Sequence, residues 1–279
     1  MTVKADEFTT VAPIEVSGLT KMFGHHGVVK RGAPQVVAVK DVSFRLETGT
    51  TLAIVGESGS GKTTVARMIM GLEVPTSGRI TYFGESRPAR PSTRQRRVYA
   101  RQMQMVFQNP YRSLDPRQPI GKAFDELLRL HFPWDAGRRA ARTAELLELV
   151  RLDGGVLRAL PGQLSGGQRQ RVCIARALAT EPRVVILDEA VAALDMSVQA
   201  QVLNVLADVR DETGVSYLFV THDLAVVRQI ADEVVVMRAG EIVERGLAAA
   251  VLDAPRHPYT RLLRDSVPRE GWKPGRRAP

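Results

Sequence analysis

A glycine-rich segment carries the first residue types suited to phosphate chemistry. It reads Gly56, Glu57, Ser58, Gly59, Ser60, Gly61, Lys62, Thr63 and Thr64. A polyphosphate needs many main-chain N–H groups at once, and glycines let the chain wrap closely around it. We expect Lys62 to reach the β- and γ-phosphates of a nucleotide and the Thr63 hydroxyl to bind Mg²⁺. The alternative is an ordinary glycine-rich turn without a ligand.

Two carboxylates directly follow an apolar segment later in the chain. Residues 184–187 are all apolar, and Asp188 and Glu189 come directly after them. Ligands of open parallel sheets bind at the carboxyl ends of the strands, so we expect both side chains to face the phosphate site. Asp188 is suited to hold the metal, and Glu189 is suited to polarise an attacking water. A solvated acidic pair at a strand end is the alternative.

The surrounding pattern alternates strands with helices, which is typical of a mostly parallel sheet covered by helices. The run Thr51–Val55 predicts a buried strand before the glycine-rich segment, and apolar residues at helical spacing predict a helix from Thr63 onward. Helical periodicity over about 109–164 indicates a helical insert. Further predictions are strands at 14–19, 36–39, 42–46, 184–187 and 215–220, helices at 167–180, 198–209 and 224–230, and a hairpin of strands 234–237 and 241–244. The glycine- and histidine-bearing stretch 24–34 predicts a loop or insertion, and the proline-rich tail after Ala254 shows little periodicity.

Length and composition fit a folded globular protein. The chain has 279 residues, of which 44% are hydrophobic and 25% charged, which excludes a wholly disordered chain. The longest apolar run, 247–252, is far shorter than the roughly 20 residues of a membrane-spanning helix. The single cysteine, Cys173, excludes internal disulfides and clusters held by several cysteines of this chain. We expect a reducing cytoplasmic environment, because no secretory signal is visible.

The charge balance is basic. The formal net charge is +9, and arginines gather between Arg87 and Arg101 and in the tail. Charge alone leaves nucleic acid, phosphate ligands and an anionic membrane surface open as partners. We expect both arginine clusters to be solvated surfaces and no nucleic acid to bind, because Tyr99 is the one aromatic residue within the first cluster.

A third motif identifies a family. Residues 164–168, Leu-Ser-Gly-Gly-Gln, lie between the phosphate segment and the carboxylate pair. Together these motifs resemble those of the ATP-binding cassette (ABC) family, and the likeness extends over residues 14–253. The resemblance implies an α/β fold: a P-loop NTPase core with a mostly parallel sheet, an antiparallel β subdomain and a helical insert subdomain. It implies ATP and Mg²⁺ as cofactors, and a separate C-terminal tail at 254–279.

The resemblance also assigns roles to isolated residues. Gln108 is similar to the glutamine of the loop that joins core and insert, with a part in catalysis and in metal binding. His222 resembles the switch histidine that contacts the γ-phosphate, and Asp195 resembles the aspartate of a loop that crosses to a partner subunit. Taken alone, Gln108 and His222 would be interpreted as surface residues. Phe23 is a candidate for stacking on adenine, and a core phenylalanine is the alternative.

Members of this family work in pairs, and the resemblance extends that arrangement to this chain. Each ATP would lie between one phosphate loop and the Ser165, Gly166, Gly167 and Gln168 of a second ABC ATPase subunit, identical or related. The helix starting near Gly167 would offer N–H groups and a positive dipole end to the γ-phosphate. The segment 190–192 reads Ala-Val-Ala, where relatives often have a proline and a hydroxyl residue. We still expect ATP hydrolysis, because Asp188 and Glu189 are present.

Two further segments resemble one branch of the family, the oligopeptide, dipeptide and nickel importers. They are residues 106–117 and the late His257-Pro258-Tyr259-Thr260. The resemblance implies an ATPase subunit on the cytoplasmic face of the membrane, with two integral membrane permeases and, indirectly, an extracytoplasmic substrate-binding protein as partners. Di- or oligopeptides are the expected cargo, and nickel or a metal chelate is the alternative. A soluble ABC ATPase outside transport and a nucleic-acid-binding module stay open as other function classes.

Overall fold

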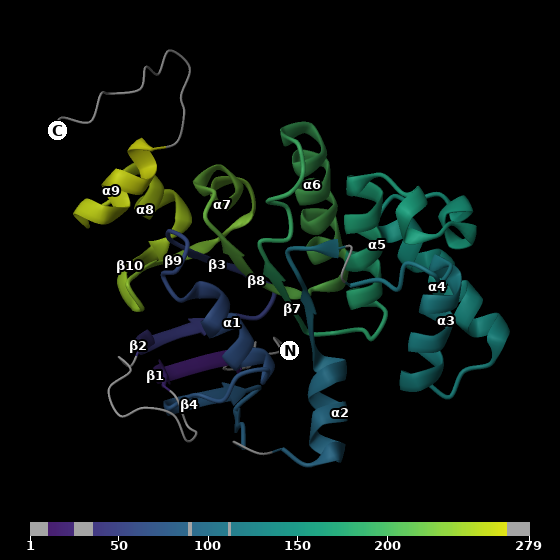
Figure 1. Ribbon diagram of the computed structural model, residues 1–279, viewed down its shortest axis with the longest axis horizontal. Coiled ribbons are helices and arrows are strands. Elements are labelled where there is room, and N and C mark those ends of the chain that lie inside the picture. The colour runs from purple at the N-terminus through teal and green to yellow at the C-terminus, as the bar shows by residue number, and fades with distance from the viewer. Residues whose placement is uncertain (1–10, 25–35, 89–90, 111–112, 267–279) are drawn as a thin grey trace, which may run out of the picture.

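The computed structural model describes residues 11–24, 36–88, 91–110 and 113–266. Most of the predicted loop at 24–34 and the last residues of the tail lie outside these ranges, so those predictions stay untested. The described chain forms two sheets with helices packed around them (Figure 1). Among the described helices, none is long and apolar enough to span a membrane.

The larger sheet has six strands in the order β10-β9-β3-β8-β7-β6. Its members are β3 (Thr51–Val55), β6 (Met103–Val106), β7 (Val184–Asp188), β8 (Ser216–Thr221), β9 (Glu233–Arg238) and β10 (Glu241–Leu247). All neighbouring pairs are parallel except β9 and β10, which form an antiparallel hairpin. Every residue of β3, β7 and β8 is buried, as expected for parallel strands covered on both faces. The predicted mostly parallel sheet is confirmed.

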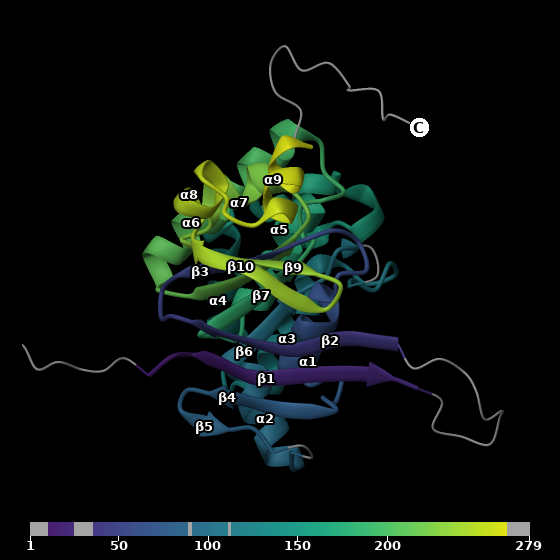
Figure 2. The ribbon, with the colours of Figure 1, turned by 90° about the vertical axis from the view of Figure 1, so that its left-hand side faces the viewer.

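The smaller sheet is antiparallel, with the order β2-β1-β4-β5. Its strands are β1 (Ile14–Phe23), β2 (Val36–Leu46), β4 (Ser77–Tyr82) and β5 (Glu85–Ser86). Figure 2 shows β2, β1 and β4 side by side below the larger sheet. Helix α1 (Lys62–Met70) lies between the two sheets, since its buried Val65, Met68 and Ile69 share one cluster with residues of both. This cluster anchors the helix that follows the phosphate segment.

The opposite face of the larger sheet is covered by α5 (Gly166–Leu178), α6 (Met196–Thr213) and α7 (Leu224–Ile230) (Figure 1). Successive side chains of β3 point to opposite faces of the sheet. Leu52 and Ile54 pack with α1, whereas Ala53 and Val55 pack with α7. The insert contains α3 (Ile120–His131) and α4 (Ala136–Leu149), followed by 3₁₀ turns at 154–158 and 161–163. It shares a hydrophobic cluster with α5, so the predicted helical insert is confirmed.

Several sequence predictions of local structure were wrong or incomplete. The two pieces 36–39 and 42–46 form one strand, β2, because Asp41 takes a positive φ of 49° within it and the pairing with β1 continues across that irregularity. The sequence did not predict the strands β4, β5 and β6, the arginine-rich helix α2 (Thr93–Gln102) or the short helix that follows β10. The tail holds α9 (Pro258–Asp265) after α8 (Ala248–Asp253). Hydrophobic periodicity does not predict α9, because only Tyr259 and Thr260 of its eight residues are buried.

Candidate active site

The phosphate segment is a loop between β3 and α1 whose glycines are required at specific positions. A Cβ atom on Gly56 would lie 2.2 Å from the main-chain oxygen of Met237, and one on Gly61 would lie 2.4 Å from that of Ala38. Gly61 also has a φ of 102°, which L side chains rarely adopt. The loop is therefore shaped by main chain from β2 and β9 that closes over it. Glu57, Ser58 and Gly59 remain exposed at its tip.

Lys62 is the first residue of α1 and points back into the loop. Its side chain is buried, and its Nζ donates to the main-chain oxygens of Gly56 and Glu57 at 2.8 Å each and to Ser60 Oγ at 3.4 Å. Burial lowers the pKa of Lys62, while the carboxylate of Glu189 acts in the opposite direction. The charge of Lys62 is thus held inside the loop, where a bound phosphate would meet it.

Two of the three predicted metal ligands, Thr63 and Asp188, lie together, and the third, Gln108, is hydrogen-bonded to Glu189. The Thr63 hydroxyl donates to Asp188 Oδ1 at 3.0 Å, and Asp188 sits nearly buried at the carboxyl end of β7. Burial raises the pKa of Asp188, and the hydrogen bond from Thr63 partly opposes that shift. A hydroxyl and a carboxylate are hard oxygen ligands that fit Mg²⁺, which completes its shell with phosphates and waters. In the described ranges, no group of three or more His, Cys, Asp or Glu could hold a metal ion.

Glu189 connects the ends of three neighbouring strands. Its main-chain N–H donates to Val220 of β8 at 2.8 Å, in a conformation with a φ of 49°. Its Oε2 accepts from Gln108 Nε2 at 2.8 Å, after β6, and its Oε1 lies 3.4 Å from His222 Nδ1, after β8. The structure therefore brings Glu189, Gln108 and His222 together. With Lys62 they are the side chains predicted to act in catalysis. The carboxylate is fixed in direction by a partner on each oxygen.

The signature segment occupies the start of α5. Ser165 is its N-cap: the Ser165 Oγ accepts from the Gln168 N–H, while the Gln168 side chain accepts from the Ser165 N–H. Ser165 and Gly166 are exposed, whereas a Cβ atom on the buried Gly167 would meet Val198 Cγ1 of α6 at 2.4 Å. The first turn thus leaves its outer surface open to another molecule, with its inner surface packed against α6.

Asp195 and Phe23 lie at the edges of the site. Asp195 is the N-cap of α6, and hydrogen bonds from the Val198 N–H and the Ser197 hydroxyl lower its pKa. Phe23 ends β1 and is 42% exposed, with Lys21 Nζ 4.8 Å from the ring centroid. The alternative of a core phenylalanine is therefore wrong. Stacking of the exposed ring on adenine stays a prediction.

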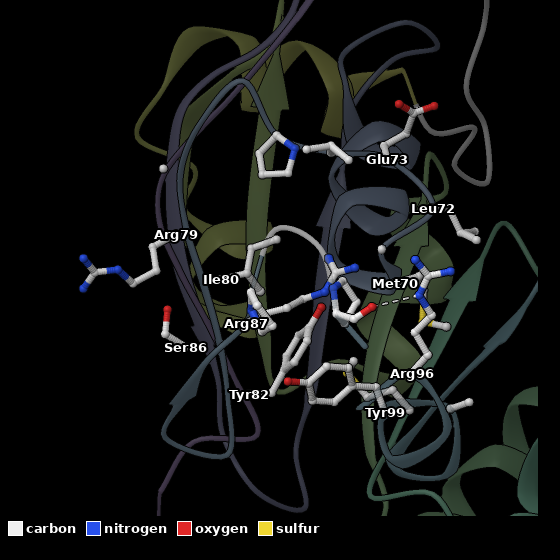
Figure 3. Close-up of a pocket in the computed structure, with 18 residues that line it drawn as sticks. Met70, Leu72, Glu73, Arg79, Ile80, Tyr82, Ser86, Arg87, Arg96 and Tyr99 are labelled. Atoms are coloured by element: carbon white, nitrogen blue, oxygen red, sulfur yellow. Dashed lines mark hydrogen bonds between the residues drawn. The ribbon is translucent and has the colours of Figure 1, made fainter. Parts of the chain in front are cut away.

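The arginine cluster at 87–101 is more than a solvated surface. Arg87 donates to the Met68 main-chain oxygen at 2.9 Å and stacks on Tyr82, and Arg101 lies 4.6 Å from the ring centroid of Phe132. Arg87, Tyr82 and Tyr99 line a pocket beyond the C-terminal end of α1 (Figure 3). Its volume is about 650 Å³. Arg87 and Arg101 thus contact other elements, whereas Arg94, Arg96 and Arg97 are exposed on α2, as expected of a solvated surface.

One contact to the phosphate loop was missed by sequence reasoning. The Tyr259 hydroxyl of α9 accepts from the Glu57 N–H at 3.0 Å. Tyr259 belongs to the His-Pro-Tyr-Thr segment, which was used only as a marker of the importer branch. The signal that could have suggested it is a tyrosine, with its polar tip, in an otherwise proline-rich tail.

Comparison with known sequences places the chain in a family. Residues 39–192, more than half of the chain, match the sequence pattern of the family described as ABC transporter. The chain belongs to the ABC transporter family. The predicted family and the ABC ATPase fold are thereby confirmed, and with them the prediction that the chain is an ATPase.

Individual ABC proteins are similar over most of their length. An ATP-binding protein assigned to peptide import in Brucella abortus (strain 2308) is 48% identical over 232 residues, which are 83% of this chain and 70% of that one. The dipeptide transport ATP-binding protein DppF of Haemophilus influenzae is 45% identical over 235 residues, 84% and 72% of the two chains. Among solved structures, the dimeric post-hydrolysis state of the ABC protein MJ0796 bound to ADP and phosphate has a TM-score of 0.74. It is 27% identical and covers 84% of this chain and 98% of that one.

Proposed function

We propose that this ABC ATPase powers a membrane importer whose cargo is di- or oligopeptides. The relatives named for peptide import and dipeptide transport support the cargo class. The observation that supports the chemistry is the position of Glu189, which is held by Gln108 and His222 at the same sheet edge as Thr63 and Asp188. This arrangement offers separate groups for the phosphates, the metal and the attacking water.

Lys62 and the N–H groups of the phosphate loop would bind the β- and γ-phosphates, and the dipole of α1 favours their negative charge. Thr63 and Asp188, with the amide oxygen of Gln108, would hold Mg²⁺, which neutralises charge on the phosphates. Glu189 would accept a proton from the attacking water while Gln108 and His222 keep its carboxylate aimed. The exposed ring of Phe23 would cover the adenine.

The exposed start of α5 supports a site that two chains complete together. We place the γ-phosphate of an ATP bound to a second ABC ATPase subunit against Ser165, Gly166, Gly167 and Gln168, with Asp195 at the same interface. The dimeric MJ0796 structure shows that a relative of this fold associates in pairs. Residues 14–253 would form the ATPase domain and 254–279 the tail. Two permeases at the cytoplasmic face of the membrane would receive the motion, and a substrate-binding protein would act on them from the other side.

Co-purification tests this assignment directly. The chain, expressed with the genes beside its own, should purify from detergent-solubilised membranes with two integral membrane proteins. ATP hydrolysis by the complex should rise when a peptide-loaded binding protein is added, and the empty binding protein is the control. If a binding protein loaded with a nickel chelate, and not with peptide, raises ATP hydrolysis, the cargo is a metal chelate and the peptide assignment is wrong. Isolation without membrane proteins, together with salt-sensitive nucleic-acid binding, would contradict the transport function.

A further inference from the structure

The C-terminal helix reaches the phosphate loop through one side chain. Tyr259, in α9, is 3% exposed, and its hydroxyl accepts from the main-chain N–H of Glu57 at 3.0 Å across 202 positions of sequence. Glu57 itself lies at the exposed tip of the loop. A buried side chain from the far end of the chain therefore holds an exposed segment that must bind a ligand.

The Tyr259 ring is fixed by hydrogen bonds around the start of α9. His257 is the N-cap, and its Nδ1 accepts from the Tyr259 N–H at 3.2 Å. The carboxylate of Glu244, on β10, accepts from the N–H groups of Arg256 at 2.7 Å and His257 at 3.1 Å. The guanidinium of Arg238, on β9, lies 4.9 Å from the ring centroid. The hydroxyl is thus positioned by the β9–β10 hairpin, which belongs to the same sheet as the strand before the loop.

The peptide group that Tyr259 holds, Gly56–Glu57, also supplies one of the two main-chain oxygens that position Lys62, and the next peptide supplies the other. The main-chain oxygens on both sides of the Glu57 N–H, those of Gly56 and Glu57, each accept from Lys62 Nζ at 2.8 Å. Rotation of the Gly56–Glu57 peptide would move the Gly56 oxygen and, with it, one of the two main-chain acceptors of the ammonium group. One hydrogen bond from α9 therefore restrains both the entry of the loop and the position of its charge.

We propose that Tyr259 is a positioning residue for ATP, which keeps the phosphate loop in its binding shape before nucleotide arrives. Preorganisation of this kind lowers the entropy lost on binding and acts on affinity more than on the chemical step. The His-Pro-Tyr-Thr segment then has a local function in this chain: His257 caps α9, Pro258 starts it, and Tyr259 restrains the loop. This inference rests on the proposed binding of ATP by the loop.

Tyr259→Phe in the full-length chain removes the hydroxyl and keeps the ring. We expect the Kd for MgATP of the isolated chain, and the KM of the assembled complex, to rise about 3- to 10-fold, the effect of one lost hydrogen bond. The kcat should change less than about twofold, because Glu189, Gln108 and His222 are not contacted. The matched control is Tyr82→Phe, which removes a buried hydroxyl that donates to the main-chain oxygen of Ile69 at the other end of α1. The control should leave the Kd for MgATP unchanged.

Hydrogen exchange of the wild-type chain gives a second, independent measurement. Without nucleotide, the Glu57 amide should exchange more slowly than the exposed Ser58 and Gly59 amides, and Tyr259→Phe should remove that difference. Equal exchange rates in the wild type, an unchanged Kd and KM in Tyr259→Phe, or the same change in Tyr82→Phe would each overturn the inference. A wild-type chain that binds no MgATP would instead contradict the proposed function, so the two failures are distinguishable.

Discussion

The phosphate loop and the start of α5 both present the N-terminus of a helix, but different contacts stabilise them. The loop depends on distant parts of the chain: main chain of β2 and β9 packs against Gly61 and Gly56, and Tyr259 holds Glu57. The first turn of α5 is capped by its own residues, through the reciprocal hydrogen bonds of Ser165 and Gln168, although its inner surface packs against α6. Distant segments of the same chain therefore stabilise the loop. The α5 turn is capped by its own residues, and its outer surface is exposed.

This difference separates mutations that break the fold from mutations that break function. A change in the closely packed loop must disturb its neighbours, so ATP binding and stability should fall together. A change on the outer surface of the α5 turn should leave the single chain intact and affect only what a second subunit contacts. Glu189 combines both cases. Its hydrogen-bonding partners lie within the chain, whereas its proposed function is to accept a proton from the water beside ATP.

The largest effect is expected for Glu189→Gln. The amide keeps the size of the side chain but has no basicity, so turnover should fall about 10²- to 10⁴-fold. MgATP should still bind, because Lys62, Thr63 and Asp188 are unchanged, and the ATP-loaded pair of subunits should accumulate. Turnover and ATP-dependent association, measured by size-exclusion chromatography, check both outcomes.

Glu181→Gln is the control for this substitution. Glu181 also has a positive φ, 54°, but it lies after α5 in an ion pair with Arg142. It should hydrolyse ATP at the wild-type rate. Near-normal turnover in Glu189→Gln would reject the role of a general base, and lost ATP binding would indicate damage to the metal site.

Gly166→Ala tests whether the α5 turn acts on a partner's nucleotide. The new Cβ atom would meet Leu194 Cδ2 at 3.5 Å, an ordinary contact, and the residue is helical, so thermal stability and ATP binding by the single chain should not fall. The added methyl group would displace the partner's γ-phosphate, and a displacement near 1 Å lowers turnover by up to about 10²-fold. Gly162→Ala, whose new Cβ atom would meet nothing within 4 Å, is the control. Equal turnover in both variants would remove the α5 turn from the proposed site.

Gly56→Ala tests the opposite behaviour. The Cβ atom would lie 2.2 Å from the Met237 oxygen, and main chain cannot move aside as a side chain does. We expect a loss of about 3 kcal/mol in the free energy of unfolding, from overpacking and backbone strain together, with weaker ATP binding. Gly59→Ala has open space around it and only the strain of a φ of 81°, so its loss should be about 1 kcal/mol. Urea unfolding measures both, and equal losses would contradict the close packing of the loop.

The same contrast explains what the sequence could predict. Strand β3 and helix α7 were predicted with the bounds the structure shows, because their apolar runs report local burial. Helix α2 has no buried residue and is started by a Ser92–Gln95 capping box, so hydrophobic periodicity could not reveal it. Hydrophobic periodicity also gives no information on contacts between residues far apart in the sequence.

Within the site, Lys62, Thr63 and the carboxylate pair followed from residue chemistry alone. Gln108 and His222 were found only by resemblance, since a single polar residue after a strand carries no pattern of its own. The bond between Tyr259 and Glu57 joins residues 202 positions apart, and nothing local to either residue encodes it. Such contacts come from tertiary packing, which motifs do not describe.

The smallest effect is expected for Asp195→Asn. Asparagine caps helices about as well as aspartate, so stability near pH 7 should stay close to wild type. The Asp195 pKa is lowered in the folded chain by hydrogen bonds to the carboxylate, so its stabilisation is fully present above the unfolded value of about 3.9 and is lost as pH falls through the folded value. The wild type should therefore lose stability relative to Asp195→Asn below about pH 4. Parallel unfolding curves from pH 6 to 3 test this, and a constant difference between the two proteins would show that the carboxylate gains nothing from capping α6. If turnover at pH 7 nevertheless falls in Asp195→Asn, the charge acts beyond its own helix, as a residue at the subunit interface would.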